Sequence, residues 1–128
     1  MRVEKEDVEL KMEIPGAVIR QRTNFGDVSG YGKISCEYFV LAAGVDTTTL
    51  FQGLEGDRCQ CPHWGFVLSG QVTTTDAKGA TETVRTNDLF HWPPGHNVKV
   101  DKDARLIMFS PEKEHSLVLD HMIDKTKG

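Results

Sequence analysis

Turn-forming residues divide this chain into apolar segments that are too short for typical helices. Twelve glycines are spread over the 128 residues, and β-branched and aromatic residues gather between them. The segments that resemble short strands are residues 17–21, 33–41, 63–69, 71–75, 81–85, 89–92, 96–100 and 105–109. Short strands that recur about every 8–12 residues, with turns between them, are typical of β-sandwiches and β-barrels. The sequence therefore predicts an all-β fold.

Residues 33–41 show the clearest strand pattern. Ile34, Tyr38 and Val40 alternate along the segment, as they would on one face of a strand. Cys36 belongs to the same alternating set, and we expect it to be a small buried hydrophobic residue.

One short C-terminal helix is predicted over residues 111–124. Ser110 suits the N-cap and Pro111 suits the first helical position. The first turn carries acidic side chains, which the helix dipole stabilises there. Residues at helical spacing are Leu117, Val118, His121 and Met122. A strand is the alternative, because Leu117 and Leu119 also alternate.

Length and composition indicate one globular domain over residues 1–128. The chain has modal domain length, with 38% hydrophobic and 27% charged residues. The formal net charge is −4 and no block of lysine or arginine is present, so we expect no nucleic-acid partner.

The sequence also predicts a protein of the cytosol without a membrane segment. No run of about 18 apolar residues is present, and the charged N-terminus lacks the apolar core of a signal peptide. The three cysteines are an odd number, which does not suit a disulfide framework.

The segment from Cys59 to Gly70 combines reactive side chains with a strand pattern. In an extended chain, residues two apart share a face, so Asp57, Cys59, Cys61 and His63 are expected on one side, although Pro62 indicates an irregularity. Thiolate and imidazole groups suit a divalent transition metal: zinc first, with iron, nickel or copper as alternatives.

A further ligand is expected from a neighbouring strand. His96 is the first candidate because it follows the turn at Pro94 and Gly95, and His91 is the second. Two alternatives stay open for the thiols of Cys59 and Cys61. They are packing, or a redox pair whose disulfide would be strained and labile.

The other face of the same strand is also apolar. Trp64, Phe66 and Leu68 lie opposite His63 and Val67 by strand alternation. A strand that is apolar on both faces needs a cover on its outer side, which the C-terminal helix, an N-terminal strand or a second subunit could supply. We expect a homodimer.

With these residues identified, the chain resembles the cupins, whose first motif is G(X)5HXH(X)3-4E(X)6G. Counting back from Gly70 places His63 at the glutamate of that motif, with Cys59 and Asp57 at its two histidines. The second motif, G(X)5PXG(X)2H(X)3N, has a match in Pro93-Pro94-Gly95. Its histidine position holds Val98, and His96 stands two residues earlier.

The resemblance covers about residues 33–109 and implies a double-stranded β-helix, the jelly-roll barrel, followed here by the C-terminal helix. It is a resemblance to small single-domain cupins of the Cys-x-Cys-Pro-His-Trp-Gly type, and it implies no particular activity. The expected metal ligands are Cys59, Cys61, His63 and His96, and the additional ligand or pocket candidates are Asp57, His91 and Trp92.

The resulting functional hypothesis is a metal-binding cupin that holds a small molecule in the barrel mouth, where metal-assisted catalysis could occur. The alternative is a non-catalytic module that senses metal or redox state through a closed Cys/His site. A third reading is a metal-free barrel that assembles with partners through Trp64, Phe66 and Leu68. An open coordination position beside a cavity would favour the first hypothesis over the second.

Overall fold

A computed structural model describes residues 1–28 and 30–127. In this part of the chain, seven strands form one antiparallel sheet in the order β1-β2-β3-β7-β4-β5, and β6 pairs with the free edge of β4. The elements are η1 (Lys5–Asp7), β1 (Leu10–Ile14), β2 (Ala17–Arg22), β3 (Ile34–Leu41), η2 (Glu55–Asp57), β4 (His63–Thr75), β5 (Thr81–Arg85), β6 (Leu89–Trp92), β7 (Asn97–Pro111) and α1 (Glu112–Thr126). The predicted all-β architecture with one short C-terminal helix is confirmed.

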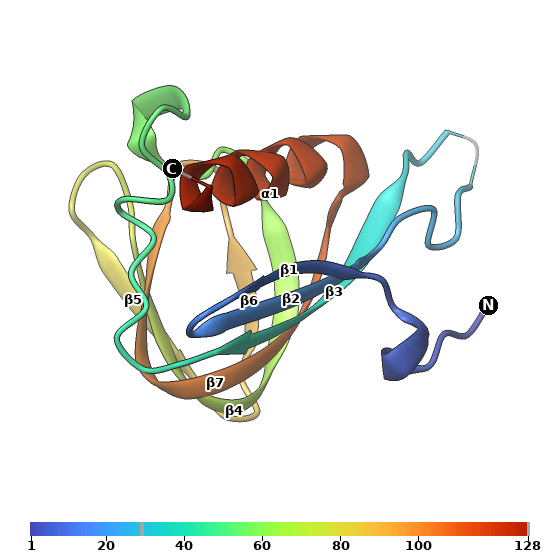
Figure 1. Ribbon diagram of the computed structural model, residues 1–128, viewed down its shortest axis with the longest axis horizontal. Helices are drawn as coiled ribbons and strands as arrows, with labels where there is room; N and C mark the ends of the chain where they lie inside the picture. Colours follow the sequence, from blue (N-terminus) through green and yellow to red (C-terminus); the bar gives the residue numbers. More distant parts are fainter. Residues whose placement is uncertain (29, 128) are drawn as a thin grey trace.

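Strands β4 and β7 are the long central strands, and the sheet curves around them (Figure 1). Each joins two segments that the sequence suggested were separate strands, and β1 was not predicted at all. β4 turns at Gly70, where its second neighbour changes from β6 to β5. Gly70 has a φ of 98°, and a Cβ there would lie 2.2 Å from the carbonyl oxygen of Asp103 on β7. Only glycine fits both the left-handed backbone and this close strand crossing.

The buried face of β3 is the opposite of the one that the apolar alternation suggested. Ser35, Glu37, Phe39 and Leu41 are buried, whereas the alternating set is half-buried or exposed. Cys36, expected to be buried, is only half-buried. The strand itself is confirmed. Its polar residues point inward because their hydrogen-bonding partners lie inside the barrel.

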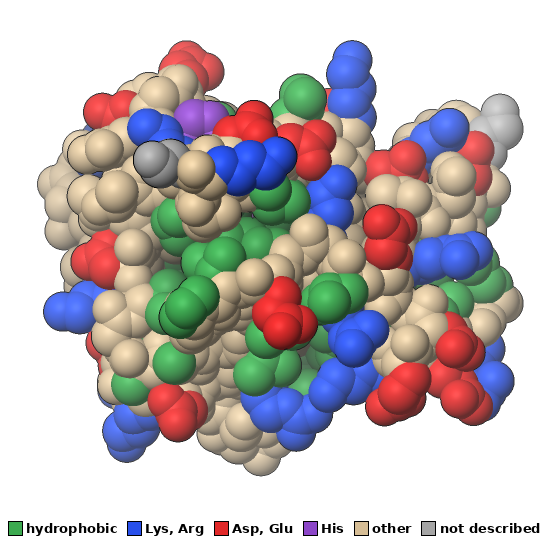
Figure 2. Space-filling view, viewed as in Figure 1, with side chains coloured by type: hydrophobic (Ala, Val, Ile, Leu, Met, Phe, Trp, Pro, Cys, Tyr) green, Lys and Arg blue, Asp and Glu red, His purple; other side chains and the backbone are tan. Residues whose placement is uncertain are grey.

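Helix α1 lies across one end of the curved sheet (Figure 1). Its buried residues, which face the barrel interior, are His115, Val118, Leu119 and Met122. Two polar contacts hold its outer part: the Lys11 ammonium lies 3.0 Å from the Asp120 carboxylate, and the His121 ring bonds the Gln52 carbonyl oxygen at 2.7 Å. Figure 2 shows hydrophobic side chains gathered in the middle of the face below α1, with charged groups around them.

The start of α1 corrects the predicted cap. Pro111 is the N-cap residue, and no side chain of residues 1–28 or 30–127 caps the helix. The Ser110 hydroxyl, expected to cap it, instead points into the barrel and bonds Glu37 and His63. No helix in the described residues is long and apolar enough to cross a membrane.

The strand crossing at Gly70 yields a stability prediction. Gly70→Ala should lower the free energy of unfolding by at least about 2 kcal/mol, because it adds backbone strain and a clash with β7. Gly79→Ala is the matched control: Gly79 has a φ of 83°, but nothing lies within 4 Å of an added Cβ, so only backbone strain of about 1 kcal/mol is expected. Urea unfolding measures both, and equal losses would contradict the role of the crossing.

Candidate metal centre

Three buried side chains from two segments of the chain converge inside the barrel. His63 opens β4, Cys59 lies in the segment before it, and His96 directly precedes β7. Cys59 and His96 are held together by backbone: the Cys59 N–H donates to the His96 carbonyl oxygen at 3.0 Å. The Pro93-Pro94-Gly95 turn makes this pairing, since the Gly95 N–H donates to the Cys59 carbonyl oxygen at 2.8 Å.

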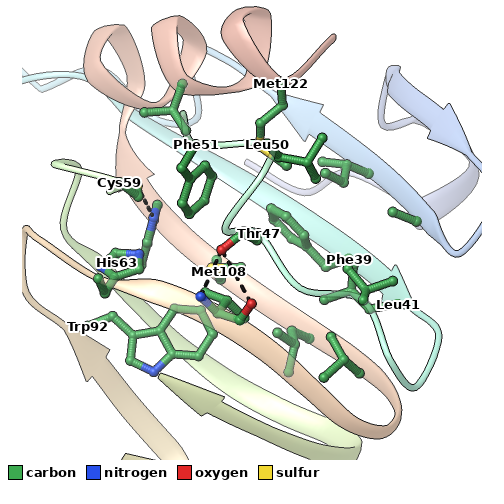
Figure 3. Close-up of a pocket in the computed structure, with 18 of the residues that line it drawn as sticks. Phe39, Leu41, Thr47, Leu50, Phe51, Cys59, His63, Trp92, Met108 and Met122 are labelled. Atoms are coloured by element: carbon green, nitrogen blue, oxygen red, sulfur yellow. Dashed lines mark hydrogen bonds between the residues drawn. The ribbon is translucent and has the colours of Figure 1, made fainter. Parts of the chain in front are cut away.

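The ligand atoms of Cys59, His63 and His96 all lie within 4.8 Å of one another. The Cys59 Sγ lies 3.5 Å from the His63 Nε2, and the two side chains point toward each other (Figure 3). Zinc bonds of about 2.3 Å to sulfur and about 2.0 Å to nitrogen at a tetrahedral angle put those two atoms about 3.5 Å apart. The His96 Nδ1–H donates to the Pro93 carbonyl oxygen at 2.8 Å, which leaves its Nε2 for a metal. The donor set therefore fits a transition metal.

Burial sets the protonation of these groups. It lowers the pKa of His63 well below its usual value, helped by the nearby His115 and His96, and it lowers the pKa of His96 against the opposing bond to Pro93. Burial raises the pKa of Cys59 to about 12. Both imidazoles are therefore neutral and ready to bind a metal, while the thiol must release a proton when a metal binds.

The other predicted residues lie outside this three-residue group. Cys61 is buried, but its Sγ lies 3.4 Å from the Pro62 carbonyl oxygen. Asp57 is exposed and accepts the Gly53 N–H, because η2 interrupts the extended chain that the alternation assumed. His91 stacks on Trp64, with ring centroids 4.9 Å apart, and bonds the backbone of His63.

Trp92 forms one wall of the site. Its buried indole lies edge-on to His63, with ring centroids 6.3 Å apart, and 5.7 Å from the ring of His96. It thus packs against two of the three candidate ligands and lines the cavity beside them.

A second polar cluster adjoins the first and was not predicted. Glu37, His63 and His115 form another group whose ligand atoms lie within 4.8 Å of one another, and Ser110 lies among them. Of these residues, Ser110 was expected to cap the helix, and the sequence pattern had not singled out Glu37 or His115. Helical spacing could have flagged His115, since it lies three residues before the inward-facing Val118.

A cavity of about 50 Å³ lies beside the three candidate ligands, between the sheet and α1 (Figure 3). That volume is enough for a few water-sized groups. Its walls are mainly apolar, with Phe51 and Met122 on the side of the helix. Cys59, His63, His96, His115 and Thr47 supply its polar lining, and among the described residues no lysine, arginine or carboxylate is part of it.

The comparisons with known proteins identify the fold. No family model and no curated protein matches the sequence. Among solved structures, an RmlC-like cupin from Shewanella frigidimarina matches with a TM-score of 0.59 and 14% identity, over 89% of this chain and 93% of that one. The polyketide cyclase RemF from Streptomyces resistomycificus matches with a TM-score of 0.58 and 20% identity, over 87% and 78%.

A larger enzyme shares the same architecture. Oxalate decarboxylase from Lactobacillus farciminis matches with a TM-score of 0.57 and 18% identity, over 84% of this chain. The match covers only 31% of the decarboxylase chain, so this protein spans about a third of it. At these identities the similarity shows the fold alone: the chain has the cupin fold.

The neutral imidazoles predict acid sensitivity in the metal-free protein. Below pH 6.5 the unfolded chain binds protons at His63 and His96, but the folded chain does so only below the lowered pKa values, so stability falls as the pH falls through this window. The expected loss is about 1.4 kcal/mol per pH unit for each fully neutral histidine. Urea unfolding between pH 7 and pH 5 measures it. His63→Gln should show a shallower slope, and a flat profile in the wild type would contradict the burial argument.

Proposed function

We propose that this protein is a metal-binding cupin that holds a small molecule next to its metal. The convergence of Cys59, His63 and His96 beside an apolar cavity is the observation that carries the proposal. Three protein ligands leave a tetrahedral ion one open position, which is the arrangement of catalytic rather than structural zinc sites. The cavity gives that position a place for a ligand.

Zinc is the proposed metal, with iron, nickel and copper as alternatives, because one thiolate and two imidazoles suit a borderline-soft ion. When bound, it would act as a Lewis acid toward a ligand oxygen or activate a water molecule. The protein's part is to supply neutral His63 and His96, to give up the Cys59 proton, and to keep bulk water out through Phe51 and Met122.

The side chains that line the cavity also limit which class of ligand can bind. Since none of the described residues that line it is cationic, the cavity offers no side chain that could clamp a second anionic group. We therefore propose a small molecule that offers one oxygen, such as a carbonyl or a single carboxylate, and a short apolar remainder. The apolar surface contributed by Ile19, Phe39 and Leu106 would bind that remainder.

The alternative is a sensing module with a closed site. It would need Cys61 as a fourth ligand, and Cys61 shares the burial of Cys59 and lies only two residues from it. Its present contact with Pro62, away from the group of three, favours the open site.

Metal analysis of protein purified without a histidine tag tests the site. We expect about one metal ion per chain in the wild type and loss of the metal in Cys59→Ser, His63→Ala and His96→Ala. A cobalt-loaded wild type should show a thiolate-to-cobalt charge-transfer band that is absent in Cys59→Ser. Cys61→Ser and His91→Ala are the controls and should retain the metal.

The outcomes separate the hypotheses. Unchanged metal content in both Cys59→Ser and His63→Ala would reject this site. Loss of metal in Cys61→Ser would instead support the closed module. A wild type without metal, combined with unchanged stability in Cys59→Ser, would support a barrel that only assembles with partners.

We also propose a homodimer formed through the outer face of the central strands. Trp64 is 46% exposed and Phe109 41% exposed, and these two residues are paired neighbours on β4 and β7. Phe25 approaches Phe109, with ring centroids 6.4 Å apart, and Leu89 on β6 is exposed. Helix α1 faces the barrel interior, so it leaves this apolar face uncovered.

Size-exclusion chromatography with light scattering tests the dimer. The wild type should have twice the mass of one chain, and Trp64→Glu should be a monomer because the charge would be buried at the interface. Leu117→Glu replaces an exposed apolar residue on α1 and should remain a dimer. A monomeric wild type at high protein concentration would disprove the proposal.

The remaining expectations stay proposals. A cytosolic location agrees with three free cysteines, which a reducing compartment maintains. The absence of a nucleic-acid partner agrees with the net charge of −4. One domain over residues 1–128 agrees with a single sheet that contains all seven strands of the described residues.

A further inference from the structure

A carboxylate with four hydrogen-bond donors lies behind the candidate metal site. Glu37 on β3 is 1% exposed. Its Oε2 accepts from the Ser35 hydroxyl at 2.9 Å, from the Gln21 amide at 3.3 Å and from His115 Nδ1, and its Oε1 accepts from the Ser110 hydroxyl at 2.8 Å. The two oxygens of this buried carboxyl group therefore act as the acceptors of all four hydrogen bonds.

This carboxylate determines what Ser110 can do for His63. The Ser110 Oγ lies 2.7 Å from the His63 Nδ1. A hydroxyl has one proton, and the Ser110 proton goes to Glu37. Toward His63, Ser110 can therefore only accept, so the ring proton of neutral His63 must be on Nδ1.

The other nitrogen of His63 then carries a lone pair. Nε2 is the atom that lies 3.5 Å from the Cys59 Sγ. If Glu37 were absent, the Ser110 hydroxyl could donate to Nδ1, and the ring proton would move to Nε2. That proton would point at Cys59 and occupy the position that a metal needs.

We propose that Glu37 is a positioning residue that acts through Ser110 to hold His63 in its metal-binding tautomer. The inference rests on the proposed function for the metal, but the tautomer itself is a property of the metal-free protein. His115, from α1, donates to the same carboxylate, so the helix contributes to this hydrogen-bond network. Its ring also lines the cavity, beside any ligand held there.

The same atoms argue against a second metal site in this cluster. Glu37, His63 and His115 are a carboxylate and two imidazoles, a set that metals use. However, the carboxylate already accepts four donors, and the His63 Nδ1 is committed to Ser110. The cluster is complete as a hydrogen-bond network, so we expect one metal per chain rather than two.

Two buried serines provide a matched comparison. Ser110 and Ser35 are both fully buried, and each donates one hydrogen bond to Glu37. Of the two, Ser110 is the one bonded to His63. Ser110→Ala and Ser35→Ala therefore remove similar contacts from the carboxylate, but Ser110→Ala also removes the acceptor that selects the tautomer.

The first readout is nitrogen NMR of the imidazoles in metal-free protein at neutral pH, with the His63 signals assigned by their loss in His63→Gln. We expect the Nδ1–H tautomer of His63 in the wild type and in Ser35→Ala, and a mixture or the Nε2–H tautomer in Ser110→Ala. Glu37→Gln should also change the tautomer, because its amide can donate to Ser110 and reverse the hydroxyl. An Nε2–H tautomer in the wild type, or the same tautomer in all variants, would overturn the proposal.

The second readout is cobalt affinity, measured by competition with a chelator. Ser110→Ala should bind cobalt about 10–100-fold more weakly than the wild type, the range found when a partner behind a metal ligand is removed. Ser35→Ala should stay close to the wild type. Equal losses of cobalt affinity in the two variants would show that Glu37 has only a structural role. Two cobalt ions per chain would contradict the prediction of a single metal site.

The experiments distinguish a failure of the metal-binding proposal from a failure of the positioning role of Glu37. If the wild type bound no metal, the metal-binding proposal would fall, but the NMR comparison would still decide whether Glu37 and Ser110 select the tautomer. If the wild type bound metal, lost it in Cys59→Ser and kept full affinity in Ser110→Ala, only the positioning role would fall.

Discussion

The pairing of β4 with β7 is the constraint on which the rest of the structure depends. These strands form the longest ladder in the sheet, and they carry His63 at one end of β4 and Ser110 near the end of β7. They cross so closely at Gly70 that a methyl group would meet the backbone of Asp103. The pairing of Trp64 with Phe109 at this end of the ladder places the neighbouring His63 and Ser110 side by side, where the imidazole and the hydroxyl meet at 2.7 Å.

Burial is the second constraint, because it decides which polar groups the interior can hold and in which protonation state. A carboxylate inside an apolar barrel is tolerated only if it is fully hydrogen-bonded, and Glu37 collects its donors from β2, β3, β7 and α1. The same burial keeps His63 and His96 neutral and Cys59 protonated. The site thus carries no charge of its own without a metal, and a metal would enter by replacing one thiol proton.

Much of the fold could be predicted because strand and turn signals are local. Gly70, the Pro93-Pro94-Gly95 turn and the apolar run after His63 indicated the all-β architecture before any tertiary contact was known. The prediction failed where tertiary partners outweighed the local pattern. β3 turns Ser35 and Glu37 inward because donors and acceptors on other elements meet them there. Ser110 leaves its capping role because a buried carboxylate and an imidazole are better partners than a helix end open to water.

The candidate site, like the fold, could be predicted from the sequence only in part. The sequence by itself indicated that Cys59 and His63 share a face, because residues an even number apart do so in an extended chain, and that a turn presents His96. Only the tertiary structure brought the ligand atoms of all three within 4.8 Å of one another. The tertiary structure alone decided that Asp57 points away and that Cys61 faces Pro62, since η2 and the local backbone set those directions. It also decided that Glu37, Ser110 and His115 stand behind His63. They come from three separate elements, and only the closure of the barrel and the docking of α1 bring them together.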